Sequence, residues 1–318
     1  MSAPPLQAEL ARLAGRVDRE LARGDSLSVP DLSAACRHLL GAGGKRMRPA
    51  LLLLSGAAVG GDSRALLPAA TAVELVHTFT LIHDDIMDRD TLRRGVPTVH
   101  VKYGLPLAIL AGDTLFARAF QKLGEARADP ARRDRAAAML AKTCVEICEG
   151  QALDMAFEER ARVTETEYLR MVGLKTAALL RASAGLGALL AGAPPAAVAR
   201  AESYGWNVGL AFQIQDDLLG LTATDELLGK SVGIDLQRKK KTLVAIHALA
   251  RGFDPNRAGR RGVASALRTL RELGSIDYAA RRARGFAVSA QRAVAPFKEG
   301  RAKDLLLQLA DYAVERGY

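Results

Sequence analysis

Three aspartates interrupt an otherwise apolar helical stretch, ELVHTFTLIHDDIMDRD, at residues 74–90. At about 3.6 residues per turn, Asp84 and Asp88 lie one turn apart on one face, and Asp85 lies about 100° round from Asp84. Burying such like charges unpaired would be costly, so a cation must lie between them. Oxygen ligands suit a hard ion such as Mg²⁺, which shares its shell with substrate phosphates. The alternative is a solvated, aspartate-rich helix end, and the flanking apolar residues argue against it.

Basic residues in two glycine-containing loops flank this cluster. They are Lys45, Arg46 and Arg48 in GAGGKRMRP (41–49), and Arg93 and Arg94 in TLRRGVP (91–97). Two arginines beside a metal-filled carboxylate cluster would repel it unless an anion lay between. The pattern therefore predicts that a phosphorylated substrate is held through metal.

A second stretch, SYGWNVGLAFQIQDDLLGL, repeats the anomaly. Asp216 and Asp217 interrupt an apolar run, with Gln213 on the preceding turn. Two such clusters can face each other. The polar segment that follows brings Lys230 and a basic run at 238–241, which alone would indicate a solvated face.

Lys175 and Thr176 stand in the apolar sequence GLKTAALL. Taken alone, a lysine in such a setting more often extends its amine to water than binds a ligand.

The composition favours one helical domain over residues 1–318. With 318 residues and 49% hydrophobic content, the chain can bury a large core, and no linker divides it. Aromatic residues make up only 5%, while Ala, Leu and Gly abound, which favours packed helices over sheet. Helical spacing predicts elements at 6–24, 31–40, 50–59, 64–88, 106–123, 131–157, 166–190, 196–221, 242–250, 260–273, 276–294 and 299–315.

Cysteine usage, hydropathy and charge limit the possible cellular location and binding partners of the protein. Three cysteines without a CxxC pair indicate a reduced, cytoplasmic protein. The uncharged stretch 182–199 nearly reaches the length of a membrane span, but Pro194, Pro195 and several glycines interrupt it, so we expect none. The net charge of +10 suits small anionic substrates or an anionic surface. Nucleic acid is disfavoured, because the basic residues are scattered and not interleaved with aromatics.

The motifs GGKRMRP, LIHDDIMD with its following RRG, LKT, and FQIQDD with its downstream GKSVG and KKT stand in one order along nearly the whole chain. In this set and order the chain resembles the trans-isoprenyl diphosphate synthases, the polyprenyl synthetase family that includes geranylgeranyl and farnesyl diphosphate synthases. The resemblance implies an all-α, isoprenoid synthase-type helical bundle around a central cavity. It also implies a homodimer that acts on isopentenyl diphosphate and allylic diphosphates with three Mg²⁺ ions.

The resemblance also implies a role for each matched residue. Asp84, Asp88 and Asp216 would ligate metal, with Asp85 and Asp217 supporting them. Lys45, Arg48, His77 and Arg94 match the site for isopentenyl diphosphate. Arg93, Lys175, Lys230 and Lys240 match positions that contact the allylic diphosphate, and Thr176 and Gln213 line the reacting end.

The expected chemistry needs no nucleophilic side chain. Cations neutralise the charge that a departing diphosphate gains, and the double bond of isopentenyl diphosphate attacks the resulting allylic cation. Diphosphate is then the expected acceptor of the lost proton. His77 is the rival base, although a substrate-binding or merely packed histidine is the simpler interpretation.

Two departures from the family pattern concern the second acidic motif. Gly220 stands where many members carry a third aspartate, which leaves the ligand count on that side open. Asp225 stands one place later than the usual aspartate, with Thr224 in its place, and we assign it no role.

Product length is expected to depend on Phe79 and Thr80. Phe79 lies five residues before Asp84, about 7.5 Å deeper along the helix, where the growing tail would pass. An aromatic residue there resembles short-chain synthases, although it could simply be core. We expect a geranylgeranyl product, with farnesyl as the alternative.

Two other activities of the same fold compete with this interpretation. A class I terpene cyclase needs no second diphosphate site, so the retained Lys45, Arg48 and Arg94 argue against it. A catalytically silent regulatory subunit would tend to lose the aspartates, and this chain keeps the first cluster.

Overall fold

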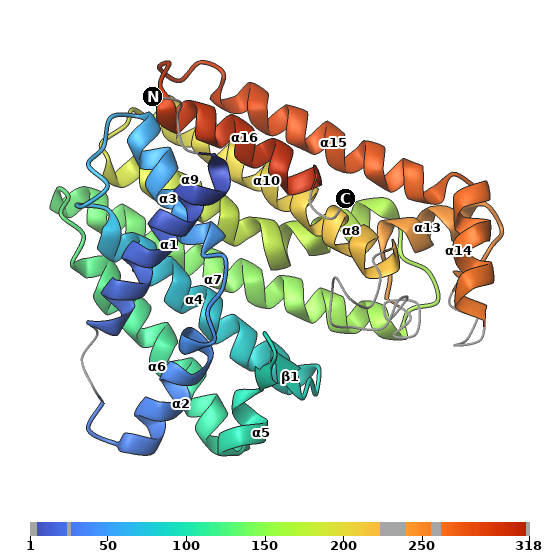
Figure 1. Cartoon of the computed structure of the whole chain (residues 1–318), viewed down its shortest axis with the longest axis horizontal. Coiled ribbons are helices and arrows are strands. Elements are labelled where there is room, and N and C mark those ends of the chain that lie inside the picture. Colours follow the sequence, from blue (N-terminus) through green and yellow to red (C-terminus); the bar gives the residue numbers. More distant parts are fainter. Residues whose placement is uncertain (1–4, 24–26, 223–239, 256–261, 316–318) are drawn as a thin grey trace. The chain divides into compact units, whose positions relative to one another are not determined.

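The computed structural model describes residues 5–23, 27–222, 240–255 and 262–315, and over these residues the chain is helical apart from one short hairpin (Figure 1). This confirms the predicted all-α class. The α-helices are α1 (Leu6–Ala22), α2 (Pro30–Gly41), α3 (Met47–Ala58), α4 (Leu67–Met87), α5 (Val99–Tyr103), α6 (Leu105–Gly124), α7 (Pro130–Glu159), α8 (Glu165–Val172), α9 (Ala178–Leu190), α10 (Pro195–Thr222), α13 (Leu243–Ala250), α14 (Val263–Glu272), α15 (Ser275–Val294) and α16 (Arg301–Glu315). No helix among them is both long and apolar enough to cross a membrane.

The chain divides into two compact units. Unit 1 comprises Met1–Cys144, Ala182–Glu202 and Phe297–Leu305, and unit 2 comprises Val145–Arg181, Ser203–Pro296 and Leu306–Tyr318. The expectation of one domain over 1–318 stays a prediction.

Unit 1 is built around α4, the helix that carries the first aspartate motif. Its long apolar run is buried on nearly all sides, and α6 packs along it, with α1 and α3 also in contact. Small residues bring two other backbones together. A Cβ at Gly187 would lie 2.1 Å from the carbonyl oxygen of Leu52, so only glycine fits where α9 meets α3. The helices packed around α4 therefore hold it in a fixed position.

Unit 2 has its own apolar core, formed by α8, α10 and the helices that follow. Tyr168, Ile214 and Leu270 are among its fully buried members. The expected single helix at 166–190 is wrong in one respect, because a π-helical turn, Gly173–Ala177, separates α8 from α9. Such a turn inserts one extra residue per turn, and hydrophobic spacing does not reveal it.

The two basic loops are also more ordered than expected. The helix predicted to begin at Ala50 begins at Met47, so Arg48 lies in its first turn. The segment predicted as a plain loop at 91–97 is a hairpin in which β1 (Leu92–Arg93) pairs antiparallel with β2 (Val96–Pro97). Arg94 and Gly95, its two central residues, have φ of 54° and 77°, as a tight turn of the primed type requires.

Candidate active site

The first acidic cluster occupies the C-terminal end of α4, where the helix dipole is negative and no basic residue stands in the last turn. The N–H of Asp88 donates to the carbonyl oxygen of Asp84 at 2.8 Å, so both belong to that final turn. Asp84 is half-buried and Asp88 is exposed. Carboxylates at a negative helix end are unfavourable unless a cation approaches them.

Asp85 differs from its neighbours because it is buried and paired. Its side chain is 1% exposed, and Arg93 Nε donates to its Oδ1 at 2.7 Å. Burial raises the pKa of Asp85, and Arg93 opposes that effect. Arg93 also lies 3.4 Å from Asp90, so in this structure it links the hairpin to the end of α4. Asp85 Oδ2 is buried and has no hydrogen-bond partner among the described residues.

A cationic group in the same unit gathers around His77. Arg48 Nη1 lies 3.1 Å from His77 Nε2, and because guanidinium only donates, His77 accepts through a neutral ring. Arg94 donates to the carbonyl oxygen of Gly43. A Cβ at Gly44 would lie 2.9 Å from the Arg94 guanidinium carbon, so this glycine makes room for the arginine. The glycine-rich loop and the hairpin thus present their cations together.

The electrostatics of this group favour an anion. Burial lowers the pKa of His77 well below its usual value, and Arg48 and Arg94 lower it further. The pKa of Arg94 is lowered too, again chiefly by burial. A negative ligand would offset both the burial of these groups and the like charges around them.

Arg46 was not assigned a role from sequence, and the structure gives it one. Its φ is 46°, and its side chain is buried. Nε donates to Asp18 at 2.9 Å and Nη1 to Glu74 at 2.6 Å, while Nη2 donates to the carbonyl oxygen of Leu40 at 2.7 Å. Arg46 therefore pins the loop between its exposed neighbour Lys45 and its half-buried neighbour Arg48.

In unit 2 the π-helical turn carries Lys175 and Thr176. Gly150 in α7 allows this turn to approach, because a Cβ there would lie 2.2 Å from the Lys175 backbone nitrogen. Lys175 Nζ then reaches Asp154 Oδ2 at 2.5 Å. Asp154 was not predicted from the sequence. Its position four residues after Gly150, within the predicted 131–157 helix, could have indicated it.

A chain of hydrogen bonds connects the turn to the second acidic motif. Thr176 Oγ1 donates to Gln213 at 2.9 Å, and Gln213 Nε2 donates to Asp217 Oδ1 at 3.0 Å. Tyr168 OH, also missed from sequence, donates to Asp217 Oδ2 at 2.7 Å. Asp217 is buried and both its oxygens are engaged, whereas Asp216 is half-buried. Asp217 thus serves as an acceptor that orients Gln213.

Some predicted residues remain untested. Lys230, Thr224 and Asp225 lie outside the described residues, and Lys240 is described and exposed. Gly220 lies in α10 after the second motif. That the two acidic motifs face each other stays a prediction. Within the described ranges no three or more His, Cys, Asp or Glu side chains form a ready-made metal-binding group.

Comparisons with known proteins show the family of the chain. Residues 29–266 match the sequence profile of the polyprenyl synthetases. The chain is 48% identical over 293 residues to a geranylgeranyl diphosphate synthase of Methanosarcina mazei, covering 91% of this chain and 90% of that protein. It is 44% identical over 311 residues to a geranylfarnesyl diphosphate synthase of Natronomonas pharaonis, covering 90% of each.

A solved structure shows the same fold. The polyprenyl synthase of Caulobacter crescentus, complexed with calcium and isoprenyl diphosphate, superposes with a TM-score of 0.86 at 31% identity and covers 99% of both chains. With most of its length matched in sequence and nearly all of it in fold, the chain belongs to the polyprenyl synthetase family.

Proposed function

We propose that this protein is a trans-prenyltransferase that condenses isopentenyl diphosphate with allylic diphosphates to make geranylgeranyl diphosphate. The observation that carries the proposal is the cationic group of Arg48, His77 and Arg94, held in the same unit as the carboxylates that end α4. Family membership and the relatives named geranylgeranyl diphosphate synthase support the same reaction.

The donor set fits a hard divalent ion such as Mg²⁺. Asp84 and Asp88 stand one turn apart at the negative end of a helix, and Asp85 beside them has a buried oxygen without a partner. Mg²⁺ is commonly held by one or two carboxylates together with substrate phosphates, so no larger preformed cluster is needed. Asp84, Asp88 and Asp216 would hold the metal, in a set of three ions per site. When bound, Mg²⁺ would neutralise charge on the departing diphosphate. The calcium in the Caulobacter structure supports a divalent ion.

The side chains of this chain bind and orient the substrates. Lys45, Arg48 and Arg94 supply charge-assisted hydrogen bonds to the diphosphate of isopentenyl diphosphate. Lys175, Lys230 and Lys240, with Arg93 at the edge of the acidic cluster, do so for the allylic partner.

His77 acts as a neutral, substrate-binding group. Its lowered pKa makes it a weak base, and Arg48 already donates to Nε2, the nitrogen that would take a proton. The departing diphosphate remains the proposed acceptor of the proton lost after condensation.

Thr176 and Gln213 line the reacting end in this proposal. Their hydrogen bond fixes the hydroxyl and amide dipoles, and Asp217 and Tyr168 brace Gln213 from the other side. Fixed dipoles stabilise a developing allylic cation without reorganising during the reaction.

We further propose a homodimer in a reducing, cytoplasmic setting. Leu105, Ile109 and Phe116 expose 50%, 43% and 38% of their surface along one stripe of α6. A second copy would cover such a stripe. Cys36, Cys144 and Cys148 form no disulfide, as a reducing compartment allows.

The direct test is an assay with labelled isopentenyl diphosphate, Mg²⁺, and dimethylallyl, geranyl or farnesyl diphosphate, followed by chromatography of the dephosphorylated products. Incorporation should require Mg²⁺ and should fall by orders of magnitude in Asp84→Asn and Asp88→Asn. Asp277→Asn, which changes an exposed aspartate in the first turn of α15, should leave the rate unchanged. No incorporation by the unmodified chain with any starter would refute the proposal.

The product length is tested at Phe79. This residue is 8% exposed, and its ring packs edge-to-face on Phe116, with the ring centroids 5.2 Å apart. Phe79→Ala opens space about one and a half helical turns before Asp84, next to Thr80. This substitution should shift the product from geranylgeranyl to longer chains. Phe297→Ala removes a ring that is 7% exposed and belongs to neither α4 nor α6, so it controls for lost packing alone. An unchanged product distribution in Phe79→Ala would remove Phe79 from chain-length control.

A further inference from the structure

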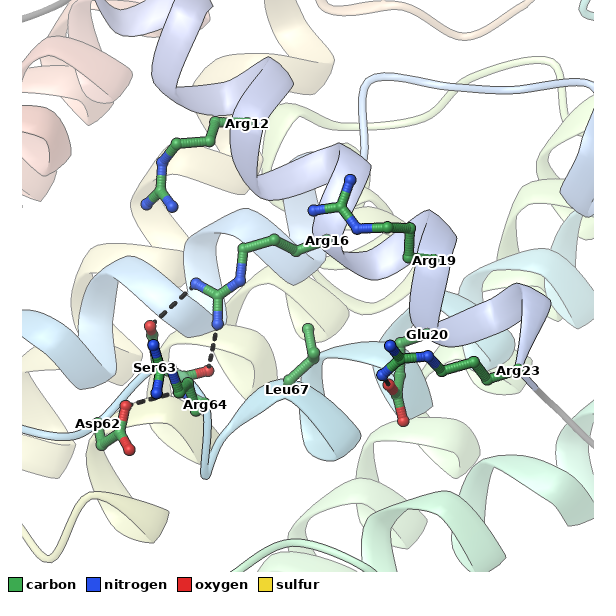
Figure 2. Close-up of a pocket in the computed structure, with 9 residues that line it drawn as sticks. All are labelled: Arg12, Arg16, Arg19, Glu20, Arg23, Asp62, Ser63, Arg64 and Leu67. Carbon is green, nitrogen blue, oxygen red and sulfur yellow. Dashed lines mark hydrogen bonds and ion pairs between the residues drawn. The ribbon is translucent and has the colours of Figure 1, made fainter.

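A second basic site lies in unit 1, and none of its lining residues belongs to the proposed active site. It is an open cavity of about 500 Å³ between α1 and the segment that leads into α4, within the size range of small-molecule sites. Its lining residues are Arg12, Arg16, Arg19, Glu20, Arg23, Asp62, Ser63, Arg64 and Leu67 (Figure 2). All of its cations are arginines, and the lining contains no lysine and no aromatic residue.

The arginines share one face of α1 because of their spacing. Arg12, Arg16, Arg19 and Arg23 recur at steps of four, three and four residues. The buried stripe of Leu10, Leu13 and Val17 occupies another face and anchors the helix. In Figure 2, Arg16 extends from α1 to Ser63, whereas the Arg19 side chain lies along α1, where its Nη1 is 3.6 Å from the position of a Cβ on Gly15.

The two carboxylates of the lining are already engaged. Glu20 lies 2.7 Å from Lys122 Nζ and 3.7 Å from Arg23. Asp62 Oδ1 accepts from the backbone nitrogen of Arg64 at 2.8 Å. Asp62 keeps its charge and offsets part of that of Arg16. Arg12 is paired with Glu9, whose Oε1 lies 2.6 Å from Arg12 Nη2. The guanidinium groups left in excess are those of Arg16, Arg19 and Arg64.

Arg19 and Arg64 retain unused donors. Within the described part of the chain, neither guanidinium makes a hydrogen bond or an ion pair. Arg16 is half-buried and donates to the hydroxyl and carbonyl oxygens of Ser63 at 2.9 and 3.2 Å. Burial lowers the pKa of Arg16, the charges of Arg12, Arg64 and Arg19 lower it further, and Asp62 opposes them.

The start of α4 adds to the positive potential. Leu67, a lining residue, is the first residue of this 21-residue helix, and its N-cap Leu66 provides no side-chain cap. The start of the helix contributes the positive end of its dipole rather than open donors, because Leu67 N–H donates to the Arg64 carbonyl oxygen at 3.4 Å and Pro68 has no N–H. The arginines and the helix start thus favour the same kind of ligand.

We propose that this cavity binds an anionic phosphate group, for which the several charges of diphosphate are the best match. Guanidinium groups present paired donors that match phosphate oxygens, and several arginines suit an anion with several charges better than a lone carboxylate. A nucleic-acid strand is disfavoured, because the cavity offers no aromatic surface for stacking bases. The phosphate comes either from free diphosphate or from a phospholipid headgroup.

The experiment uses the full chain in EDTA and inorganic diphosphate as the probe in calorimetric titrations. Arg19→Ala/Arg64→Ala is compared with Arg268→Ala/Arg284→Ala, which removes the same charge from exposed arginines of α14 and α15. The first variant should lose one binding site per chain, or bind there at least about tenfold more weakly. The control should match the unmodified chain, and both should keep their prenyl-transfer rate, since neither touches the proposed active site.

A second arm identifies the source of the phosphate. Flotation with phosphatidylglycerol vesicles, against phosphatidylcholine vesicles, is measured for the same variants. A loss of binding confined to Arg19→Ala/Arg64→Ala supports the site. If the loss is seen in calorimetry, the ligand is free diphosphate. If the loss is seen in vesicle flotation, the ligand is a lipid headgroup. Identical behaviour of that variant and the control with both probes would overturn the proposal. Because the prenyl-transfer assay is separate, failure here leaves the proposed enzyme activity standing.

Discussion

Arg46 shows how one buried side chain fixes the positions of its functional neighbours. Its guanidinium is almost entirely buried with Glu74, whose side chain is 1% exposed. Burial alone would lower the pKa of Arg46, but Glu74 and Asp18 outweigh it and raise the pKa instead. Burial also raises the pKa of Glu74, with Arg46 opposing. Each charge is tolerated because of the other, so the pair should be sensitive to losing one partner.

We expect Arg46→Met to destabilise the protein by about 3–5 kcal/mol, the usual cost of leaving a buried charge without its partner. The measurement is the free energy of unfolding in denaturant. Methionine is strained by the left-handed φ of position 46 as arginine is, so the difference in stability between the two proteins reports the loss of the charge.

The double variant Arg46→Met/Glu74→Met supplies the control for this prediction. Removing both charges leaves no buried ion unpaired, so most of the stability should return. A double variant as unstable as the single one would show that the loss comes from packing and not from charge.

His77 predicts a pH dependence. Its folded-state pKa is lowered by burial and by neighbouring arginines, so the unfolded chain binds the proton first as the pH falls. The neutral ring carries no penalty above the unfolded pKa of about 6.5, and stability falls as the pH drops below it. The melting temperature between pH 7.5 and 5.5 should fall more for the unmodified chain than for His77→Gln. Equal falls would contradict the assignment.

At the scale of single residues, the sequence predicted which residues belong to the candidate site better than it predicted the surroundings of each one. Asp84, Asp85 and Asp88 were recognisable because carboxylates in an apolar run need a cation. Their different environments were not recognisable, because Asp85 pairs with Arg93, eight residues later, through a hairpin that the spacing did not predict. The role of Arg46 was hidden for the same reason, since Asp18 and Glu74 each lie 28 residues away.

At the scale of elements, the π-helical turn places the Lys175 and Thr176 side chains. It lies against Gly150 of α7, and a Cβ there would meet backbone atoms of Lys175 and Leu174 at 2.2–2.7 Å. Backbone cannot move aside as a flexible side chain can, so the packing of α7 on this turn requires glycine.

Gly150→Ala should therefore destabilise the protein by about 1–3 kcal/mol and reduce prenyl transfer, because it displaces the Lys175 backbone. Gly285 is the matched control: it lies within α15, and a Cβ there would meet nothing within 4 Å. Gly285→Ala should stabilise by about 0.5–1 kcal/mol through helix propensity, with activity unchanged. Both free energies are measured by denaturant unfolding. Stabilisation by both substitutions would refute the close approach.

Helical spacing predicted most elements because the apolar stripes of α1, α6 and α15 repeat at three and four residues. It missed α5, which has only five residues, and the π-helical turn, whose extra residue leaves the apolar pattern on either side intact. It placed the start of α3 too late, because Pro49 is a loop signal in sequence but is also tolerated in the first turn of a helix.

At the scale of the whole molecule, the exposed apolar stripe of α6 predicts self-association. Leu105, Ile109 and Phe116 lie within about 40° of one another around the helix. They stand beside the buried face through which α6 packs on α4. A stripe continuous with a packed face is the kind of surface that two-fold homodimers cover, because the same patch then serves both subunits.

Ile109→Asp should therefore convert the proposed homodimer to monomer, because a charge buried in an apolar interface without a partner costs several kcal/mol. Val288→Asp is the control, since Val288 in α15 and Ile109 are each 43% exposed, so the two substitutions add the same charge at equal exposure. Light scattering after size exclusion measures the mass of each variant. If Ile109→Asp stays dimeric, or if Val288→Asp dissociates equally, α6 is not the interface.

Because Phe116 of the exposed stripe packs on Phe79, the monomer should also show an altered product distribution. Such a change would link subunit contact to the control of chain length.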